Sequence, residues 1–591
     1  MNRKVFGIIQ ALTVLVGMGY LINTNAYYQP YLVVLVFALF AYTKVKEYHY
    51  KWHLFVAPMI YGLAVMAANY TIWSGFSYPD EIGVSGRFLH SACMFLGIFV
   101  GAYFQAFNIC QYLYDRALAA ADRKGALEGE SIALFRTSGW KPWQVFLIPF
   151  LSIVAIDNII LFTCRYPGTV SSDSLTQIKM FMEGWYNNHH PFYHTQVIRL
   201  FVSLGLKLFG DLNAAVAFFN VFQIFFMAAC FSAAVMTIWQ VSAKRSYFIL
   251  LAVFYAVMPF HINYSFAVWK DVWFGGFVLL FCIYFFRTMH SIGLQKLNYV
   301  FLTIGALGIC LFRSNGYVMF LVVAVVYLFL FRKNIFAGKD KVIFMFVAVL
   351  ISSFILKHPV LKALDVSQPD TVEMLSIPLQ QISRTAVEYD DFSEEDLELI
   401  NDVISIDRMR EVYHPQYSDP EKDLIRAEGN QLTIRDNKLE YAFLYIRVGL
   451  KHPNTYLKAW VDQTCGYWNS GYNYWRWLDD VTSEEGYDLF RTVNSEFAAR
   501  HFYEYQWMYE NNPVLILFLC IGFYVWIDWL LLYLAAVNGD KAGVVMAMPV
   551  IALVFTLQIS SPVYSEFRYV YSIFCTVPFL LAAIINNKKT L

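Results

Sequence analysis

Charged residues are scarce in this chain. Only 15% of its 591 residues are Asp, Glu, Lys or Arg, whereas 58% are hydrophobic and 18% are aromatic. Soluble globular proteins carry about 25% charged residues, so this composition excludes an ordinary soluble domain and indicates a polytopic membrane protein. The first apolar run, residues 5–22, lacks a small-residue cleavage site and is followed by further apolar runs. We therefore expect it to remain as a span rather than be removed as a signal peptide.

Cysteine patterns and nucleotide-binding motifs are also missing. The nine cysteines show neither paired nor metal-ligand spacing, and nearly all lie inside apolar runs, which argues against a disulfide framework or a zinc site. The chain has no G-x-G-x-x-G motif after a strand and no G-x-x-x-x-G-K-[ST] motif. A nucleotide is therefore not the expected donor or cofactor, and we expect no nucleic-acid partner.

Fourteen apolar runs are long enough, or nearly so, to cross about 30 Å of hydrocarbon at 1.5 Å per residue. The predicted fold is an all-α polytopic membrane bundle of about 14 spans with one mostly helical domain outside the membrane. Four spans and a cytoplasmic linker lie in residues 1–142, seven spans in 143–356, and three in 513–591.

Lys and Arg residues predict the orientation of the bundle. If the run 192–209 does not span and the N-terminus is cytoplasmic, the cytoplasmic loops carry 21 Lys/Arg and the short outer loops carry eight, as the positive-inside rule requires. Both termini are then cytoplasmic in a multi-pass protein of the cell membrane. The run 192–209 becomes an amphipathic or re-entrant helix, and the polar loop 164–213 lies outside.

Residues 357–512 form an acidic extracytoplasmic domain in this prediction. They hold 28 of the 44 acidic and 15 of the 44 basic residues, a local net charge of −13. The pattern indicates helices, including 393–410 and 431–450. The net charge disfavours a strongly anionic polymer as a partner, because like charges reduce encounter.

The loop 164–213 gathers the most reactive side chains of the chain, and Asp173 is the strongest candidate among them. It follows a Pro167-Gly168 turn within a run of small hydroxyl residues. Transfer of a sugar to a hydroxyl requires a base that accepts the hydroxyl proton, and an accessible carboxylate in an outer loop suits that role. The alternative is an Asx-turn residue with a local structural role.

Three histidines follow in the same loop: His189, His190 and His194. Imidazoles bind phosphate, sugar hydroxyls or a divalent metal, although this spacing is not a standard zinc pattern. We interpret them as support for a substrate site. The alternative is that they cap a helix beginning near Phe192.

Three cations stand at predicted span ends on the outer side, where charge is costly without a function. Lys270 precedes Asp271 at the start of a span, Arg313 opens an Arg-Ser-Asn-Gly turn, and Arg568 follows Glu566 before the last span. Lys270 would meet a lipid phosphate. Asp271 would cap the helix, position Lys270, or bind a divalent metal with Asp173.

The two arginines offer planar forks that match phosphate oxygens. With Lys270 they would stabilise a departing lipid phosphate. The alternatives are a snorkelling interfacial lysine at Lys270, and salt bridges from Arg313 and Arg568 to the acidic domain.

Taken in order, these motifs resemble the GT-C superfamily of integral-membrane glycosyltransferases, in particular a bacterial branch. The resemblance covers roughly residues 143–586 and leaves the four N-terminal spans outside. The motifs that carry it are Tyr166-Pro167-Gly168, Ser172-Asp173-Ser174, Asn188-His189-His190-Pro191, Trp269-Lys270-Asp271-Val272, Arg313-Ser314-Asn315-Gly316, Ile377-Pro378-Leu379-Gln380-Gln381 and Glu566-Phe567-Arg568-Tyr569.

The resemblance implies a GT-C-like core, a polyprenyl-phosphate sugar donor, an extracytoplasmic glycan or lipid acceptor, and inverting transfer with Asp173 as the base. It also implies that Gln380 and Glu566 support the substrate. Relatives often carry a second acid beside the first, but residues 172 and 174 are serines here. Glu183 and Asp271 are the candidates to replace that acid, and metal dependence stays open.

Two rival functions use the same features. A transporter or flippase of lipid-linked sugars predicts ionisable residues at mid-span, of which Asp157 and Asp528 are the clearest, together with inverted repeats; no repeat is visible. A glycan ligase would use the same outer face and would differ in the acceptor.

Overall fold

The computed structural model describes residues 3–25, 27–74, 84–124, 139–242, 244–338, 340–471 and 480–586. Regular secondary structure within these ranges is helical, and extended segments pair only through isolated bridges. The predicted all-helical class is therefore correct. The linker predicted to end the N-terminal region lies mostly at residues 125–138, outside the described ranges.

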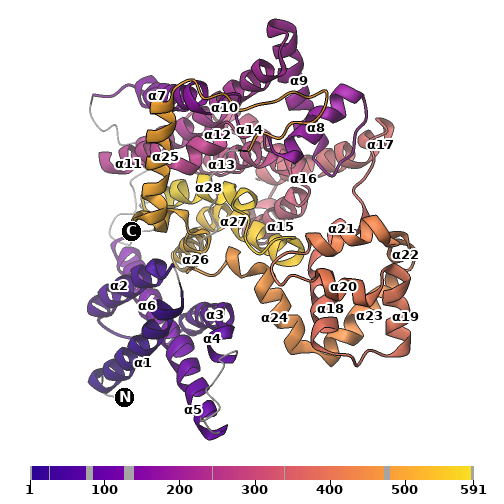
Figure 1. Ribbon diagram of the computed structural model, residues 1–591. Helices are drawn as coiled ribbons and strands as arrows, with labels where there is room; N and C mark the ends of the chain where they lie inside the picture. Colours follow the sequence, from indigo (N-terminus) through magenta and orange to yellow (C-terminus); the bar gives the residue numbers. More distant parts are fainter. Residues whose placement is uncertain are drawn as a thin grey trace.

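The N-terminal helices form a bundle of their own, drawn in indigo in Figure 1. The helix α6 packs against α1, α2 and α3, around a buried cluster that includes Met18, Tyr31 and Ile98. Tyr61 stacks edge-on against Trp526 at 4.8 Å, which joins this bundle to the remaining helices. The elements are α1 (Arg3–Thr24), α2 (Gln29–Lys44), α3 (His53–Ala68), α4 (Tyr70–Ser74), α5 (Val84–Phe95), η1 (Leu96–Val100) and α6 (Gly101–Lys124).

The membrane core is organised around α13 (Lys270–Met289), which packs against α10, α14, α27 and α28. Almost every residue of α13 is buried, as expected for a helix that is apolar on all sides. The other core helices are α7 (Pro142–Cys164), α10 (Leu212–Val241), α11 (Arg245–Val257), α12 (Pro259–Ser265), α14 (Gln295–Phe312), α15 (Gly316–Phe336), α16 (Val342–Ile355), α26 (Ile521–Val537), α27 (Lys541–Ser560) and α28 (Phe567–Asn586).

Ten described helices are long and apolar enough to cross a membrane, and eleven if α11 and α12 act together as one broken span bent by 54°. Three shorter apolar helices, α2, α3 and α26, also occur in the described part of the chain. The break before Pro259 has a local cause, because a residue preceding proline avoids the helical region, and Met258 is extended. The chain is thus a helical polytopic membrane protein.

Two helices follow α7 in the polar loop: α8 (Ser172–Glu183) and α9 (Phe192–Phe209). Neither is among the candidate spans. One face of α9 is buried against α10, while Leu200, Leu204 and Leu208 stay exposed. The helix α9 therefore packs on the core through one face and carries apolar side chains on an exposed face, and its position outside the set of spans stays a prediction.

A separate helical domain follows α16 and has its own buried core, which extends from Val372 to Tyr456. In Figure 1 it is the orange group to one side of the core, and α24 leads back to the core. The domain comprises η3 (Thr371–Leu375), α18 (Ser376–Glu388), α19 (Glu394–Val403), α20 (Ile406–Val412), α21 (Asp419–Glu428), α22 (Gln431–Asp436), α23 (Lys438–Lys451) and α24 (Pro453–Thr464), preceded by η2 (Leu356–Val360) and α17 (Leu361–Ala363).

Both helices predicted in this domain are interrupted. The 393–410 helix breaks at Ile404, whose backbone is extended, and the Asn401 side chain accepts the Ile406 N–H to start α20. The 431–450 helix breaks at Asn437, which ends α22. Asparagine competes for backbone hydrogen bonds through its side chain, and apolar periodicity does not reveal such breaks.

The second part of the predicted acidic domain belongs structurally to the core. After η4 (Cys465–Tyr467), the helix α25 (Glu496–Asn511) packs on α7, and Phe502 joins a cluster with Leu161 and Ile224. The short η5 (Leu515–Leu519) then leads into α26. The independent helical body therefore ends near Thr464.

Candidate functional site

The segment before α8 is fixed by main-chain hydrogen bonds on both sides. Thr169 donates its N–H to the Phe266 carbonyl (2.9 Å) and accepts the Val268 N–H (3.0 Å). Val170 donates to the Asp480 carbonyl (3.0 Å) and accepts the Thr482 N–H (2.8 Å). The backbone that leads to Asp173 is therefore held without help from its side chains.

Gly168 is required by this arrangement. Its φ is +116°, and a Cβ there would lie 2.0 Å from Asn220 Nδ2 and 2.6 Å from the Phe266 carbonyl oxygen. Asn220 uses that amide to donate to the Pro167 carbonyl at 2.8 Å. Only glycine combines this conformation with such close approach.

The start of α8 is tied to the start of α13. Ser171 caps α8 by accepting the Ser174 N–H, and its hydroxyl also accepts the Trp269 indole N–H at 2.8 Å. Ser174 in turn donates to the Val268 carbonyl at 2.8 Å. Asp173 consequently lies in the first turn of α8, where the helix dipole favours a carboxylate.

Asp173 forms an ion pair with Arg568, whose Nη1 lies 2.8 Å from Asp173 Oδ2. The guanidinium of Arg568 also lies over the rings of Trp269 and Tyr569, each 5.2 Å away, and 4.0 Å from Glu566. Burial alone would raise the pKa of Asp173, but the charges of Arg568 and Lys270 outweigh it and hold this pKa well below its usual range. Asp173 is therefore ionised in this state.

A second ion pair lies deeper. Arg313 Nη1 is 2.7 Å from Asp271 Oδ1 and donates to the Tyr569 carbonyl at 2.8 Å. The side chains of Arg313 and Asp271 are 9% and 1% exposed, compared with 21% and 34% for Arg568 and Asp173. Both arginines thus pair with carboxylates of α8 and α13, and the alternative that they bind the acidic domain is wrong.

Lys270 completes the cluster, and within the described ranges its ammonium makes no hydrogen bond or ion pair with another residue. Its charge nevertheless acts on both aspartates and on both arginines. Three cations and three carboxylates, counting Glu566, give the cluster a formal charge of zero. Lys270 is therefore the cation that is available for an added anion.

Two of the three histidines are buried beside this cluster. His190 is 5% exposed and its Nδ1 lacks a hydrogen-bond partner among the described residues, while His194 is fully buried and bonds Gln177 through Nδ1 at 3.2 Å. Burial, reinforced by the charge of Lys270, lowers the pKa of His190 to about 2 and that of His194 to about 3. Both imidazoles are neutral near pH 7.

Neither of these buried histidines caps the helix that follows. Asn188 does so, because its side-chain oxygen accepts the Phe192 N–H at 3.3 Å. The predicted alternative of a histidine cap is therefore wrong for α9.

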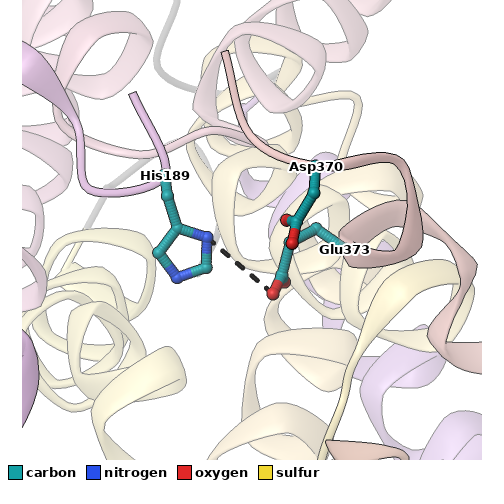
Figure 2. A group of neighbouring side chains, drawn as sticks. All are labelled: His189, Asp370 and Glu373. Atoms are coloured by element: carbon teal, nitrogen blue, oxygen red, sulfur yellow. Dashed lines mark ion pairs between the residues drawn. The ribbon is translucent and has the colours of Figure 1, made fainter. Parts of the chain in front are cut away.

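His189 points away from its neighbours toward the helical domain, and Figure 2 shows it facing Asp370 and Glu373. Its Nδ1 lies 3.8 Å from Glu373 Oε1, and the three possible ligand atoms lie within 4.8 Å of one another. Arg426, however, already binds both carboxylates, and Lys422 lies 3.5 Å from Glu373.

The ion pairs of these carboxylates argue against the predicted divalent metal site. Asp173 and Asp271 both face arginines, so neither is arranged as a metal ligand, and the His189 group is neutralised by two cations. The His189 group instead joins the polar loop to the domain. Main-chain bonds do the same, since Asn188 donates to the Ser367 carbonyl (2.8 Å) and Ser367 donates to Tyr186 (3.0 Å).

Two predicted residues lie apart from the cluster. Glu183 ends α8, roughly 15 Å along the helix from Asp173 at 1.5 Å per residue, and accepts hydrogen bonds from Trp185 and Tyr487. Gln380 is fully buried in α18, where it donates to the carbonyls of His414 and Tyr417. Glu183 therefore cannot serve as the second acid, and Gln380 braces the helical domain.

Sequence reasoning missed the aromatic residues of the site. Trp269 and Tyr569 provide the ring faces beneath the arginines, and the Trp273 indole N–H is buried without a partner among the described residues. The sequence offered one clue to them: Trp269 directly precedes Lys270, and Tyr569 directly follows Arg568.

Fold and site together define a helical polytopic membrane protein with a charge-balanced polar cluster where three helices of its core begin or end. Residues 180–590 match a family described as a family of unknown function, DUF6020, and the chain belongs to that family. No curated protein and no solved structure matches the chain. The match includes Lys270, Arg313 and Arg568 and begins within α8, just after Asp173.

Proposed function

We propose that the protein is a membrane glycosyltransferase of the GT-C type, which transfers a sugar from a polyprenyl-phosphate donor to a glycan or lipid acceptor outside the cytoplasm. The observation that carries this proposal is that Arg568 joins the proposed base to the proposed phosphate site. It binds Asp173, the proposed base, and lies among the cations that would bind a phosphate.

The donor phosphate would bind at Lys270 first, because that ammonium has no competing partner among the described side chains. Arg568 would then turn from Asp173 toward the phosphate, since a side chain that is one-fifth exposed has room to move. Arg313 would stay with the buried Asp271 and supply a fixed positive charge. A phosphodiester carries one negative charge and the departing phosphate monoester up to two, so the cations stabilise the product side more strongly.

Release of Arg568 would also activate the base. While Arg568 neutralises it, the Asp173 carboxylate is a weak proton acceptor, and loss of that cation raises its pKa toward the ordinary value. The acceptor oxygen then attacks the anomeric carbon opposite the phosphate and forms the new C–O bond. The bond between the anomeric carbon and the phosphate oxygen breaks, its electron pair leaves with the polyprenyl phosphate, and the hydroxyl proton passes to Asp173. The configuration inverts.

The remaining groups would bind the sugar and the acceptor. The neutral His190 and His194 provide uncharged hydrogen-bonding groups beside Lys270, and Glu566 lies next to Arg568. The helical domain is joined to the polar loop through His189 and would cover the acceptor side. The positive-inside pattern supports an outward-facing site with both termini in the cytoplasm.

One feature favours the flippase alternative. Asp157 and Asp528 are buried within core helices, and neither carboxylate oxygen of Asp528 has a hydrogen-bond partner in the described structure. Ionisable groups at such depth are typical of transport pathways. A ligase that moves a whole glycan would share the cation cluster and would be distinguished by its acceptor.

The test is release of polyprenyl phosphate by the protein in lipid nanodiscs supplied with a panel of polyprenyl-phosphate sugars and hydroxyl acceptors, followed by mass spectrometry. We expect Asp173→Asn to lower the rate by about 10²- to 10⁴-fold, the range for loss of a general base, while binding of polyprenyl phosphate remains. Lys270→Gln should weaken that binding. Glu183→Gln, on the same helix but outside the cluster, is the matched control.

Full activity of Asp173→Asn would refute the assignment of the base. Movement of intact lipid-linked sugar between leaflets, without release of polyprenyl phosphate from any donor, would establish the flippase alternative instead. Transfer of a complete oligosaccharide but no single sugar would indicate a ligase.

A further inference from the structure

A groove of about 480 Å³ lies between the N-terminal bundle and the core. Its walls come from α3, α15, α24, α26 and α27, together with the residue after η4, Trp468. The volume is within the ~300–1,000 Å³ typical of small-molecule sites. Its wall residues are apolar apart from Gln558.

Four tryptophans dominate these walls, and three of them have their indole N–H groups occupied. Trp460 donates to the Gln558 carbonyl (2.8 Å), Trp526 to the Trp468 carbonyl (2.7 Å), and Trp468 to the Thr464 hydroxyl (3.2 Å). These rings therefore present faces rather than hydrogen-bond donors. A sugar or another polar ligand would find few partners here, whereas a hydrocarbon chain would find aromatic surface.

The groove shares its walls with the charged cluster. The helix α27 lines the groove at Val554, Phe555 and Gln558, and between them Thr556 accepts a hydrogen bond from Asn315, two residues after Arg313. The same helix thus contacts both the groove and the turn that carries Arg313.

A second shared wall runs through α24 and η4. Trp460 lines the groove, whereas Gln463 donates to the Ser561 carbonyl (2.9 Å) and the Tyr467 hydroxyl accepts the Glu566 N–H (3.1 Å). The segment 561–568, which leads to Arg568, is therefore anchored on the wall of the groove.

We infer that this groove binds the isoprenoid chain of a lipid whose phosphate lies at the cluster of Lys270, Arg313 and Arg568. The inference rests on the proposed function and assigns the N-terminal bundle, which lies outside the matched family range, as one wall of the lipid site. Inside a membrane, apolar contact alone gives no advantage over the surrounding lipid tails. Selectivity must come from packing against the ring faces, and a methyl-branched, unsaturated chain differs from a straight chain in shape and stiffness.

The experiment uses the full-length protein in nanodiscs and two photoactivatable probes: a polyprenyl phosphate and a straight-chain alkyl phosphate of equal carbon number. Cross-linked peptides are mapped by mass spectrometry. Ala64→Trp and Ala67→Trp each fill the groove from α3. Two variants are used so that the test remains possible if one of them misfolds. Val56→Trp, on the same helix at a lipid-exposed position outside the groove, is the matched control.

We expect the polyprenyl probe to label peptides of α3, α24 and α27 in the wild type and in Val56→Trp, and the labelling to fall at least about tenfold in both filled variants. The straight-chain probe should label these peptides weakly. Equal labelling by the two probes, labelling outside the groove, or protein–protein cross-links between copies across it would each overturn the inference.

The experiments distinguish an incorrect groove assignment from an incorrect proposed function. If the groove assignment fails, polyprenyl phosphate is still released from sugar donors while the probe labels other peptides. If glycosyl transfer fails, release is absent from every donor, although the probe can still label the groove in a manner that depends on Lys270.

Discussion

Two Arg–Asp pairs of similar geometry have different physical characters because their burial differs. Arg313 and Asp271 are almost fully buried, so removal of either would leave a charge unpaired at a cost of about 3–5 kcal/mol. Arg568 and Asp173 are more exposed, so water can solvate the separated charges and parting them costs less. The first pair is a fixed part of the fold, and the second can exchange partners.

The buried histidines predict how stability depends on pH. Their folded pKa values of about 2 and 3 lie below the ordinary value of 6.5, so the unfolded chain binds more protons below pH 6.5. Stability is therefore complete above that pH and is lost as the pH falls, by about 2 kcal/mol per histidine at pH 5. Thermal unfolding in nanodiscs should show a lower Tm at pH 5 than at pH 7, and His194→Gln should reduce the difference.

Glu421 supplies a control of opposite sign. It is fully buried, both of its carboxylate oxygens lack partners in the described structure, and burial raises its pKa to about 8. The folded state retains this proton, so its contribution is lost as the pH rises from about 4.5 toward 8. Glu421→Gln should flatten the alkaline decline and, because its pH range overlaps that of the histidines, enlarge the fall in Tm between pH 7 and pH 5. An acid limb of undiminished size in His190→Gln/His194→Gln would contradict the assignment.

For single residues, the sequence predicted which charged side chains belong to the site but not which of them pair with each other. Lys270, Arg313 and Arg568 were predictable because charge at a span end is costly, and the structure brings all three together with Asp173. The pairings depend on how distant helix ends meet, which periodicity does not encode. The histidine roles were left open for the same reason, since burial decides them.

At the scale of elements, the polar loop is a fixed part of the structure rather than a mobile lid. Main-chain bonds hold residues 169–170 on two sides, and Ser171 joins the starts of α8 and α13. The first turn of α8 is thereby positioned before any side chain of the cluster makes contact. Such pre-organisation is the condition for placing a reacting group accurately.

Gly168→Ala tests this view. Because φ is positive and a Cβ would overlap Asn220 and the Phe266 carbonyl, we expect strain of about 1–3 kcal/mol and displacement of α8. Hydrogen exchange should show faster exchange in residues 166–175 and unchanged protection in α14. Gly184→Ala, at the positive-φ C-cap of α8 where the added methyl group meets nothing within 4 Å, is the control for backbone strain alone.

Hydropathy predicted the positions of helices in the membrane core accurately, and it predicted those of the other elements less accurately. Apolar runs located most core helices to within a few residues, because both their buried and their exposed faces are apolar and leave few polar interruptions. The helical domain is amphipathic, and its predicted helices are broken at Ile404, beyond which Asn401 accepts the Ile406 N–H, and at Asn437. The extended segment 480–495 carries no periodic signal, and its pairing with Val170 arises only from tertiary contact.

At the scale of the whole molecule, the N-terminal bundle is joined to the remainder by buried polar contacts. Tyr31 donates to Asn469 Oδ1 at 2.6 Å, and Tyr70 donates to Asp462 at 2.7 Å. Asp462 also binds Arg384 of α18. The bundle therefore contacts the turn after α24 directly and the helical domain through Asp462, although the matched family range begins only at residue 180.

Tyr31→Phe should weaken this junction. The buried Asn469 would lose a partner, at a cost of about 1–3 kcal/mol, and hydrogen exchange should rise in α1–α3 while α13 and α14 keep their protection. Tyr28→Phe, nearby on the same segment, is the matched control. Equal loss of protection throughout the protein would show instead that the bundle unfolds only with the core.

The contact between the helical domain and the segment before Arg568 has a mechanical consequence. Ser418 donates its N–H to the Pro562 carbonyl and Tyr564 donates to the Gln416 carbonyl, each at 2.9 Å. A rotation of the domain would therefore displace the segment 562–564, which ends four residues before Arg568. A displacement of the domain on binding a large molecule would therefore be transmitted to the charged cluster.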